Sequence, residues 1–149
     1  MFLWFKDALF ASYDKAWFKL IGGYLGYKGH VPAGRFNAGQ KMFYWYTTIF
    51  GIILSVTGLL LVWRTSFALS TICITSTIHN LVAFIMISGV FAHAYLGTIA
   101  NPGTWRVLVD GTVTREWAAH HHPMWYESLV RSGLVEPEEG SDESSDAEV

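Results

Sequence analysis

The sequence predicts an all-α membrane protein with two transmembrane helices. The 149 residues are 52% hydrophobic and 16% aromatic but only 15% charged, which is too apolar for an ordinary soluble domain of this size. Residues 43–63 form a run of 21 residues without a charge, and a second uncharged stretch covers residues 65–105. About 20 apolar residues in a helix cross a hydrocarbon core of roughly 30 Å, so each stretch is long enough to span a membrane.

The N-terminal segment, residues 1–33, is expected to lie at the membrane interface as an amphipathic helix. It mixes aromatic and aliphatic residues with the lysines Lys6, Lys15 and Lys19, a pattern typical of interfacial helices that also contact lipid headgroups. Charged residues interrupt the apolar run from Lys6 onward, so a cleavable signal peptide is not expected.

Residues 34–105 are predicted to form the transmembrane region, with spans at about 43–63 and 77–99. The second span should end before Asn101-Pro102-Gly103, because this tripeptide is a strong helix breaker. Basic residues precede the first span and follow the second, whereas the connection between the two spans has only Arg64. The positive-inside rule therefore predicts a multi-pass protein of the cytoplasmic (inner) membrane with both termini cytoplasmic.

The C-terminal part is predicted to be extramembrane. Residues 106–135 are expected to form a cytoplasmic segment containing a short helix or hairpin. Residues 136–149 hold seven of the twelve acidic residues and are expected to be a disordered acidic tail. The only cysteine, Cys73, excludes a disulfide framework and a Cys-based metal cluster within this chain, so metal chemistry would depend on histidine.

Two histidines, His79 and His93, lie on the second predicted span. Fourteen residues of helix rise about 21 Å and return the second ring to within about 40° of the first, so both rings project from one face at two depths. They are either buried histidines bonded to neighbouring helices or ligands of a cofactor. Ionisable residues in a bilayer usually mark a pathway or a cofactor, and imidazole is a common axial ligand of haem. Thr57-Gly58 and Ser88-Gly89 add small residues on the two spans, which favour either a cofactor or close helix packing.

The segment before the first span carries amide side chains that suggest a second site. Asn37 and Gln40 can donate and accept hydrogen bonds, Gly39 permits close approach of a ligand, and Lys41 can meet a phosphate or a proton path. The alternative is a helix start, with Asn37 as the N-cap and Gln40 as its capping-box partner.

Together these motifs resemble the cytochrome b (gamma) subunit of respiratory formate dehydrogenase. The resemblance covers residues from about 34 to 129 and rests on four signals: GRFNAGQKMFYW at 34–45, a span with VTG and LLVWR, the pair His79 and His93 followed by Tyr95, and DGTVTREWAAHHHPMWYESL at 110–129.

The resemblance implies a fold and a set of site residues. The family subunit is a four-helix membrane cytochrome with two haems b, of which this chain would form half. By resemblance, His79 is an axial ligand of the outer haem and His93 of the inner haem, so both bind haem iron. Asn37, Gly39 and Gln40 would form, with His93, a pocket for menaquinone or ubiquinone.

The resemblance also implies partners. An iron–sulfur beta subunit would pass electrons from a molybdenum or tungsten catalytic alpha subunit to the haems and then to quinone. We expect no catalytic site in this chain beyond quinone reduction, and no nucleic acid partner. A full subunit has two earlier helices that donate the opposite haem ligands, so these ligands are expected from another membrane chain or a second copy whose His79 and His93 face their twins.

Three alternatives remain at this stage. The chain could be a haem-free membrane anchor of a respiratory complex, or the cytochrome b of a related hydrogenase or molybdoenzyme. The three adjacent histidines 120–122 could bind a metal, but neighbouring residues on a helix point about 100° apart, so a structural or subunit-contact role is expected.

Overall fold

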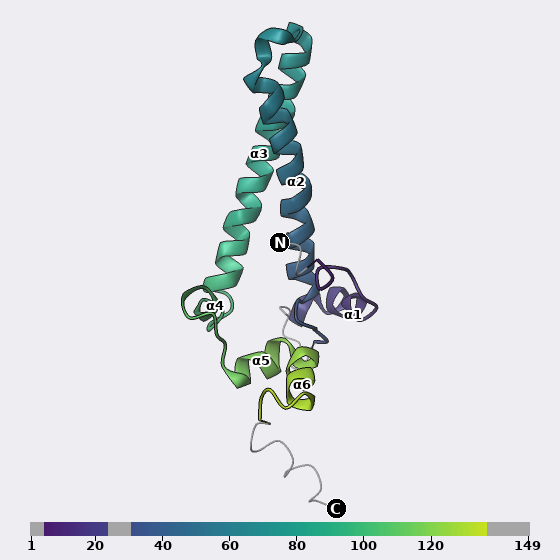
Figure 1. The fold of residues 1–149 in the computed structure, drawn as a ribbon, viewed down its shortest axis with the longest axis vertical. Coiled ribbons are helices and arrows are strands. Elements are labelled where there is room, and N and C mark those ends of the chain that lie inside the picture. Colours follow the sequence, from purple (N-terminus) through teal and green to yellow (C-terminus); the bar gives the residue numbers. More distant parts are fainter. Residues whose placement is uncertain (1–4, 24–30, 137–149) are drawn as a thin grey trace, which may run out of the picture. The chain divides into compact units, whose positions relative to one another are not determined.

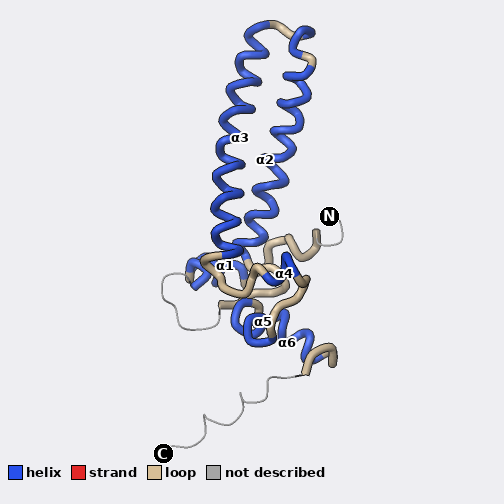
Figure 2. The backbone as a smooth tube through the Cα atoms, turned by 90° about the vertical axis from the view of Figure 1, so that its left-hand side faces the viewer, coloured by secondary structure: helices blue, strands red, loops and turns tan. Residues whose placement is uncertain are grey.

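The computed structural model describes residues 5–23 and 31–136, and every regular element within these ranges is a helix. Residues 40–105 form one compact unit, which we call the hairpin unit, and residues 1–39 with 106–149 form the other, which we call the terminal unit. The absence of strands from the described ranges, visible in Figure 2, confirms the predicted all-α class.

The hairpin unit is built from two long antiparallel helices, and the first two residues of the first helix, Ala38 and Gly39, belong to the terminal unit. Helix α2 (Ala38–Val62) is followed by a 3₁₀ turn, η3 (Arg64–Ser66), and then by α3 (Leu69–Thr98). Figures 1 and 2 show the two helices running side by side from this turn. Their 25 and 30 residues correspond to about 37 and 45 Å, enough to cross a hydrocarbon core of roughly 30 Å.

The surface of the hairpin unit is apolar. The most hydrophobic 18-residue window of each helix is only 6% buried, whereas a core helix of a soluble protein would bury most of its apolar side chains. These exposed side chains fit lipid or further transmembrane helices. The prediction of two membrane-spanning helices is therefore confirmed, and the hairpin itself supplies one helix–helix interface.

Both helices begin earlier than the apolar runs suggested. Helix α3 includes residues 69–76, which are rich in serine and threonine but contain neither glycine nor proline. Hydroxyl groups in such a helix can donate to a carbonyl one turn back, as Thr77 Oγ1 does to Cys73 O at 2.9 Å. At the other end, α3 stops at Thr98, before Asn101 as predicted, and Asn101 Nδ2 donates to Leu96 O at 2.7 Å.

The terminal unit contains only short helices among its described residues. These are α1 (Asp14–Lys19), η2 (Ile21–Gly23), α4 (Arg106–Val109), α5 (Arg115–His121) and α6 (Pro123–Arg131). The expected amphipathic helix is thus represented by the six residues of α1, while residues 1–4 and 24–30 lie outside the described residues. The predicted disordered tail also falls there, apart from Glu136.

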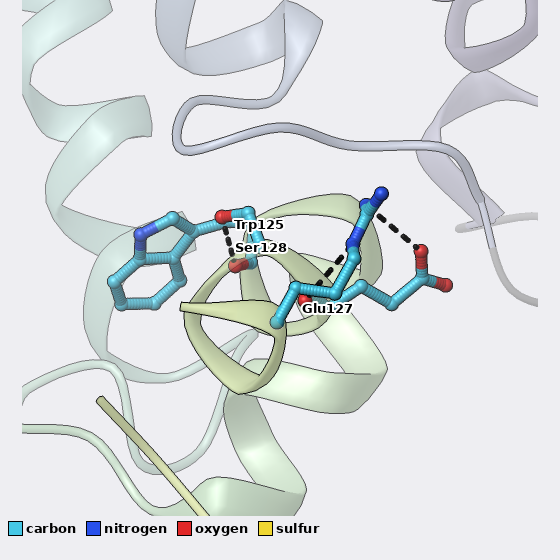
Figure 3. Close-up of polar contacts among 4 residues, drawn as sticks. Trp125, Glu127 and Ser128 are labelled. Atoms are coloured by element: carbon cyan, nitrogen blue, oxygen red, sulfur yellow. Dashed lines mark hydrogen bonds and ion pairs between the residues drawn. The ribbon is translucent and has the colours of Figure 1, made fainter. Parts of the chain in front are cut away.

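Local hydrogen bonds define the ends of α5 and α6. Thr114 caps α5 by accepting from Trp117 N at 3.2 Å, and α6 begins with Pro123, a favourable first helical residue. Near the end of α6, Figure 3 shows Ser128 Oγ donating to Trp125 O at 2.6 Å. Of the two structures predicted for this segment, a helix or a hairpin, the chain therefore adopts helices.

The loop before α2 is attached to the junction between α5 and α6. His122 Nδ1 lies 2.8 Å from Gly34 O, and Met124 N donates to Ala33 O at 3.2 Å. The exposed ion pair between Arg35 and Asp7 adds a weaker contact at 3.8 Å. Segments from the two halves of the chain therefore fold together in the terminal unit.

Candidate functional site

The first predicted ligand, His79, faces α2 in the half of the hairpin unit that is nearer the connecting turn. Its Nδ1 is 2.8 Å from Thr57 Oγ1. Its Cε1 lies beside Gly58, where a Cβ atom would be only 3.4 Å away. Thr57 is 8% exposed, so this hydrogen bond lies between the two helices and has little competition from solvent.

The second predicted ligand, His93, also faces α2, but its ring is held differently. It stacks on Phe43 with ring centroids 3.8 Å apart and an angle of 5° between the planes. No described residue forms a hydrogen bond with either ring nitrogen, and the side chain is exposed. Both nitrogens of His93 are therefore accessible to a ligand, while the stack fixes the plane of the ring.

The antiparallel hairpin explains why both rings meet α2. From His79 to His93 the chain advances fourteen residues, and the contacted residue on α2 moves back fourteen, from Thr57 to Phe43. The prediction that both rings project from one face of the helix agrees with these contacts. At 1.5 Å per residue the rings are separated by about 21 Å along α3, too far to share one metal ion.

The chemistry of these two positions fits haem. Each imidazole has a nitrogen that is not hydrogen-bonded to any described residue, and a bis-histidine haem would take one such nitrogen on each side of the porphyrin. The described residues contain no group of three or more His, Cys, Asp or Glu side chains that could hold a metal ion alone. A ligand set of one imidazole per site is suited to an iron whose equatorial ligands come from a macrocycle.

The two small-residue positions noted in the sequence are occupied by side chains of the hairpin itself. Gly58 accommodates the ring of His79, and Gly89 accommodates the ring of Tyr46. A Cβ at Gly89 would overlap the Tyr46 ring, whose hydroxyl donates to the carbonyl oxygen of Ile85. Of the two explanations left open, close helix packing accounts for both glycines in the described structure.

The predicted quinone residues lie at the start of α2. Asn37 immediately precedes the helix, in the position of an N-cap residue, and Gly39 and Gln40 lie in its first turn. Gln40 belongs to the hairpin unit and is three residues before Phe43, the residue that stacks on His93. Asn37 and Gly39 belong to the terminal unit, so a pocket shared by all four predicted residues stays a prediction.

Gly39 has a packing role that the sequence did not reveal. A Cβ at this position would be 2.8 Å from Cη2 of Trp17 and 3.3 Å from Oδ1 of Asn37. The indole of Trp17 therefore lies directly against the glycine backbone. The lack of a side chain at Gly39 is therefore required for this contact within the terminal unit.

The three adjacent histidines have separate environments. His122 is 3% exposed and its Nδ1 donates to Gly34 O, because a carbonyl oxygen can only accept. Burial lowers the pKa of His122, and the hydrogen bond to Gly34 opposes that shift. Burial also lowers the pKa of His121, with further lowering from its neighbours His120 and His122. His122 thus has the structural role that was expected.

Sequence reasoning missed Thr57 and Phe43 as the side chains that contact the two histidines. Threonines are frequent in these helices, and several donate to a carbonyl one turn back, as Thr48 does to Tyr44 O at 2.8 Å. Residue type alone therefore could not single out Thr57. The pairing across the hairpin was the available signal, since residues equally distant from the connection face each other in antiparallel helices.

Comparisons with known proteins find one family model and several curated relatives. Residues 1–111 match the family model described as prokaryotic cytochrome b561. The formate dehydrogenase cytochrome b556 subunit of Haemophilus influenzae is 34% identical over 129 residues, which cover 83% of this chain and 53% of that protein. In Escherichia coli K12, the nitrate-inducible cytochrome b556(Fdn) subunit is 33% identical over 115 residues, 74% of this chain and 52% of that protein.

A second formate dehydrogenase subunit of Escherichia coli K12, cytochrome b556(fdo), is 35% identical over 103 residues, covering 66% of this chain and 48% of that protein. The chain therefore spans about half the length of the curated relatives that it matches. These similarities confirm the resemblance that the sequence motifs indicated.

Proposed function

Because this chain belongs to the prokaryotic cytochrome b561 family, we propose that it is the membrane-anchoring haem b electron-transfer subunit of a formate dehydrogenase complex. The observation that carries the proposal is the placement of His79 and His93, whose rings face the same helix at two depths with nitrogens open to a ligand. A haem-free anchor would have no need for two such imidazoles in an apolar hairpin.

His79 and His93 each supply one axial nitrogen to a haem b in this proposal. Haem b, when bound, provides one-electron redox chemistry, which suits transfer of electrons from an iron–sulfur subunit to a membrane quinone. The chain holds each imidazole in a defined orientation, through Thr57 for His79 and through Phe43 for His93.

The opposite axial ligands come from outside the hairpin. His79 and His93 lie about 21 Å apart along the same helix, so neither can face the other across one haem. In a bis-histidine haem, the second imidazole of each site would come from a membrane segment beyond α2 and α3. The exposed apolar surfaces of both helices provide room for such neighbours.

Quinone is proposed to bind beside His93, with Asn37, Gly39 and Gln40. Gln40 supports this placement, because it lies one turn before Phe43 on α2 and Phe43 contacts His93. Amide groups can donate to the carbonyl oxygens of a quinone and accept from the hydroxyl groups of a quinol. The quinone is menaquinone or ubiquinone.

The proposed location is the inner membrane with both termini on the cytoplasmic side. The short connection between antiparallel helices puts the start of α2 and the end of α3 at the same end of the hairpin unit. Basic residues adjoin that end in the sequence, as the positive-inside rule requires for a cytoplasmic face. The proposed partners are an iron–sulfur subunit and a molybdenum or tungsten catalytic subunit.

A difference spectrum of the intact membrane complex tests the proposal. Formate should produce the α-band of reduced b-type haem, and a quinone analogue should reoxidise it. His93→Ala should abolish the reoxidation by quinone while leaving a haem that formate reduces. His120→Ala, which changes an exposed histidine of the terminal unit, serves as the control and should behave as wild type. A complex without any b-type haem spectrum would refute the proposal.

A further inference from the structure

We propose that Thr57 is a positioning residue that fixes the ring orientation and tautomer of His79, so that Nε2 is the nitrogen presented to iron. The hydroxyl of Thr57 does this by accepting a hydrogen bond from Nδ1–H. The inference rests on the proposed function only where it names iron as the atom that Nε2 binds. Orientation and tautomer are properties of the chain itself.

The position of the single hydroxyl proton of Thr57 decides the direction of this hydrogen bond. Thr57 Oγ1 lies 2.7 Å from Ile53 O and 3.3 Å from Leu54 O, and both carbonyl oxygens can only accept. The hydroxyl proton is therefore donated to Ile53 O, the usual bond of a helical threonine to the carbonyl one turn back. The lone pairs of Oγ1 remain for His79, whose Nδ1 must then carry the proton.

The opposite arrangement is unfavourable. If Nε2 carried the proton, Nδ1 would present a lone pair to Thr57, and the hydroxyl would have to donate to Nδ1. Oγ1 and Ile53 O would then face each other at 2.7 Å without a proton between them. Thr57 is buried, so no bulk water would replace the lost hydrogen bond.

Gly58 completes the orientation of the ring. Only Cε1 and Nδ1 of His79 lie within 4 Å of the position that a Cβ of Gly58 would occupy, at 3.4 and 4.0 Å. Nε2 is farther away and forms no hydrogen bond with a described residue. The ring is therefore held against α2 by its Nδ1 side and leaves Nε2 open.

This hydrogen bond should distinguish the two haem sites electronically. An acceptor on Nδ1–H makes the opposite ring nitrogen more basic, which stabilises ferric iron and lowers its reduction potential. His93 has no hydrogen-bond acceptor among the described residues and is held by the ring of Phe43 instead. The effect of Thr57 should therefore be confined to the haem at His79.

Nitrogen NMR of the full chain, labelled with ¹⁵N-histidine and free of haem in lipid, tests the tautomer directly. The signal of His79, assigned by its loss in His79→Gln, should report Nδ1–H and an unprotonated Nε2 in the wild type and in Thr57→Ser. In Thr57→Val, which keeps the shape but removes the hydroxyl, the Nε2–H tautomer should become populated. A wild-type His79 in the Nε2–H tautomer would overturn the proposal even if the complex binds haem.

Redox titration of the intact complex tests the consequence at iron. Thr57→Val should raise the potential of one haem component and leave the other unchanged, whereas Thr57→Ser should restore the wild-type value. Thr48→Val is the matched control, because Thr48 makes the same backward hydrogen bond on α2 and has no hydrogen bond to a histidine among the described residues. Identical potentials in wild type and Thr57→Val would refute the positioning role. An absence of haem from the wild type would refute the proposed function, while the NMR result would still decide the role of Thr57.

Discussion

Replacing Gly89 by alanine should destabilise the hairpin unit, because the new methyl group would overlap the ring of Tyr46. Overpacking in a close-packed interface costs about 1–3 kcal/mol. Displacing Tyr46 also breaks its hydrogen bond to Ile85 O, for about 1 kcal/mol, and the better helix propensity of alanine returns about the same amount. The expected net loss is therefore about 1–3 kcal/mol of unfolding free energy.

The assay is denaturation of the full chain in detergent, followed by far-ultraviolet circular dichroism. Gly51→Ala on α2 is the control, because a Cβ there meets no atom within 4 Å, and it should be neutral or slightly stabilising. Adding Tyr46→Ala to Gly89→Ala should remove the overlap, so the two substitutions should be strongly non-additive. Equal stability of the Gly89 and Gly51 variants would contradict the helix register, and with it the contacts of His79 and His93.

Two further predictions concern the terminal unit. Burial lowers the pKa of His122 below its usual value of 6.5, so near that pH the folded state binds fewer protons than the unfolded state. The stability that this difference gives is present above about pH 6.5 and should be lost as the pH falls through the lowered pKa. Hydrogen exchange of α5 and α6 should show this loss of stability as lower amide protection at about pH 5 than at about pH 7.5, and His122→Asn should weaken the pH dependence. Equal protection at both pH values in the wild type would contradict the prediction. Gly39→Ala should displace Trp17, change its fluorescence and slow quinone reduction. Adding Trp17→Leu should restore the packing but not the quinone reaction. Recovery of the quinone reaction in the double variant would mean that Gly39 serves packing alone.

The sequence was sufficient to predict the helices and the shared face of the histidines. Two uncharged runs identified the spans. The fourteen-residue spacing placed both histidine rings on one side of α3, and the contacts of both rings with α2 agree with that placement. The ends of the helices were less predictable, because polar residues such as Thr71 and Ser76 can continue a transmembrane helix when no glycine or proline interrupts it.

The contacts of the histidines depend on pairing across the hairpin. The connection is centred near residue 68, and Thr57 and His79 are each eleven residues from it, while Phe43 and His93 are each twenty-five residues away. The composition of either helix alone does not predict which residues of α2 and α3 face each other. The contact of Trp17 with Gly39 likewise joins segments that share no sequence pattern, so only the folded chain reveals it.

Haem content of the intact complex, measured for the wild type and for variants of His79 and His93, tests the central claim most directly. The wild type should contain haem b, His79→Ala and His93→Ala should each lose one spectral component, and the double variant should contain none. Retention of the full haem b content in the double variant would contradict the assignment of these two histidines as axial ligands.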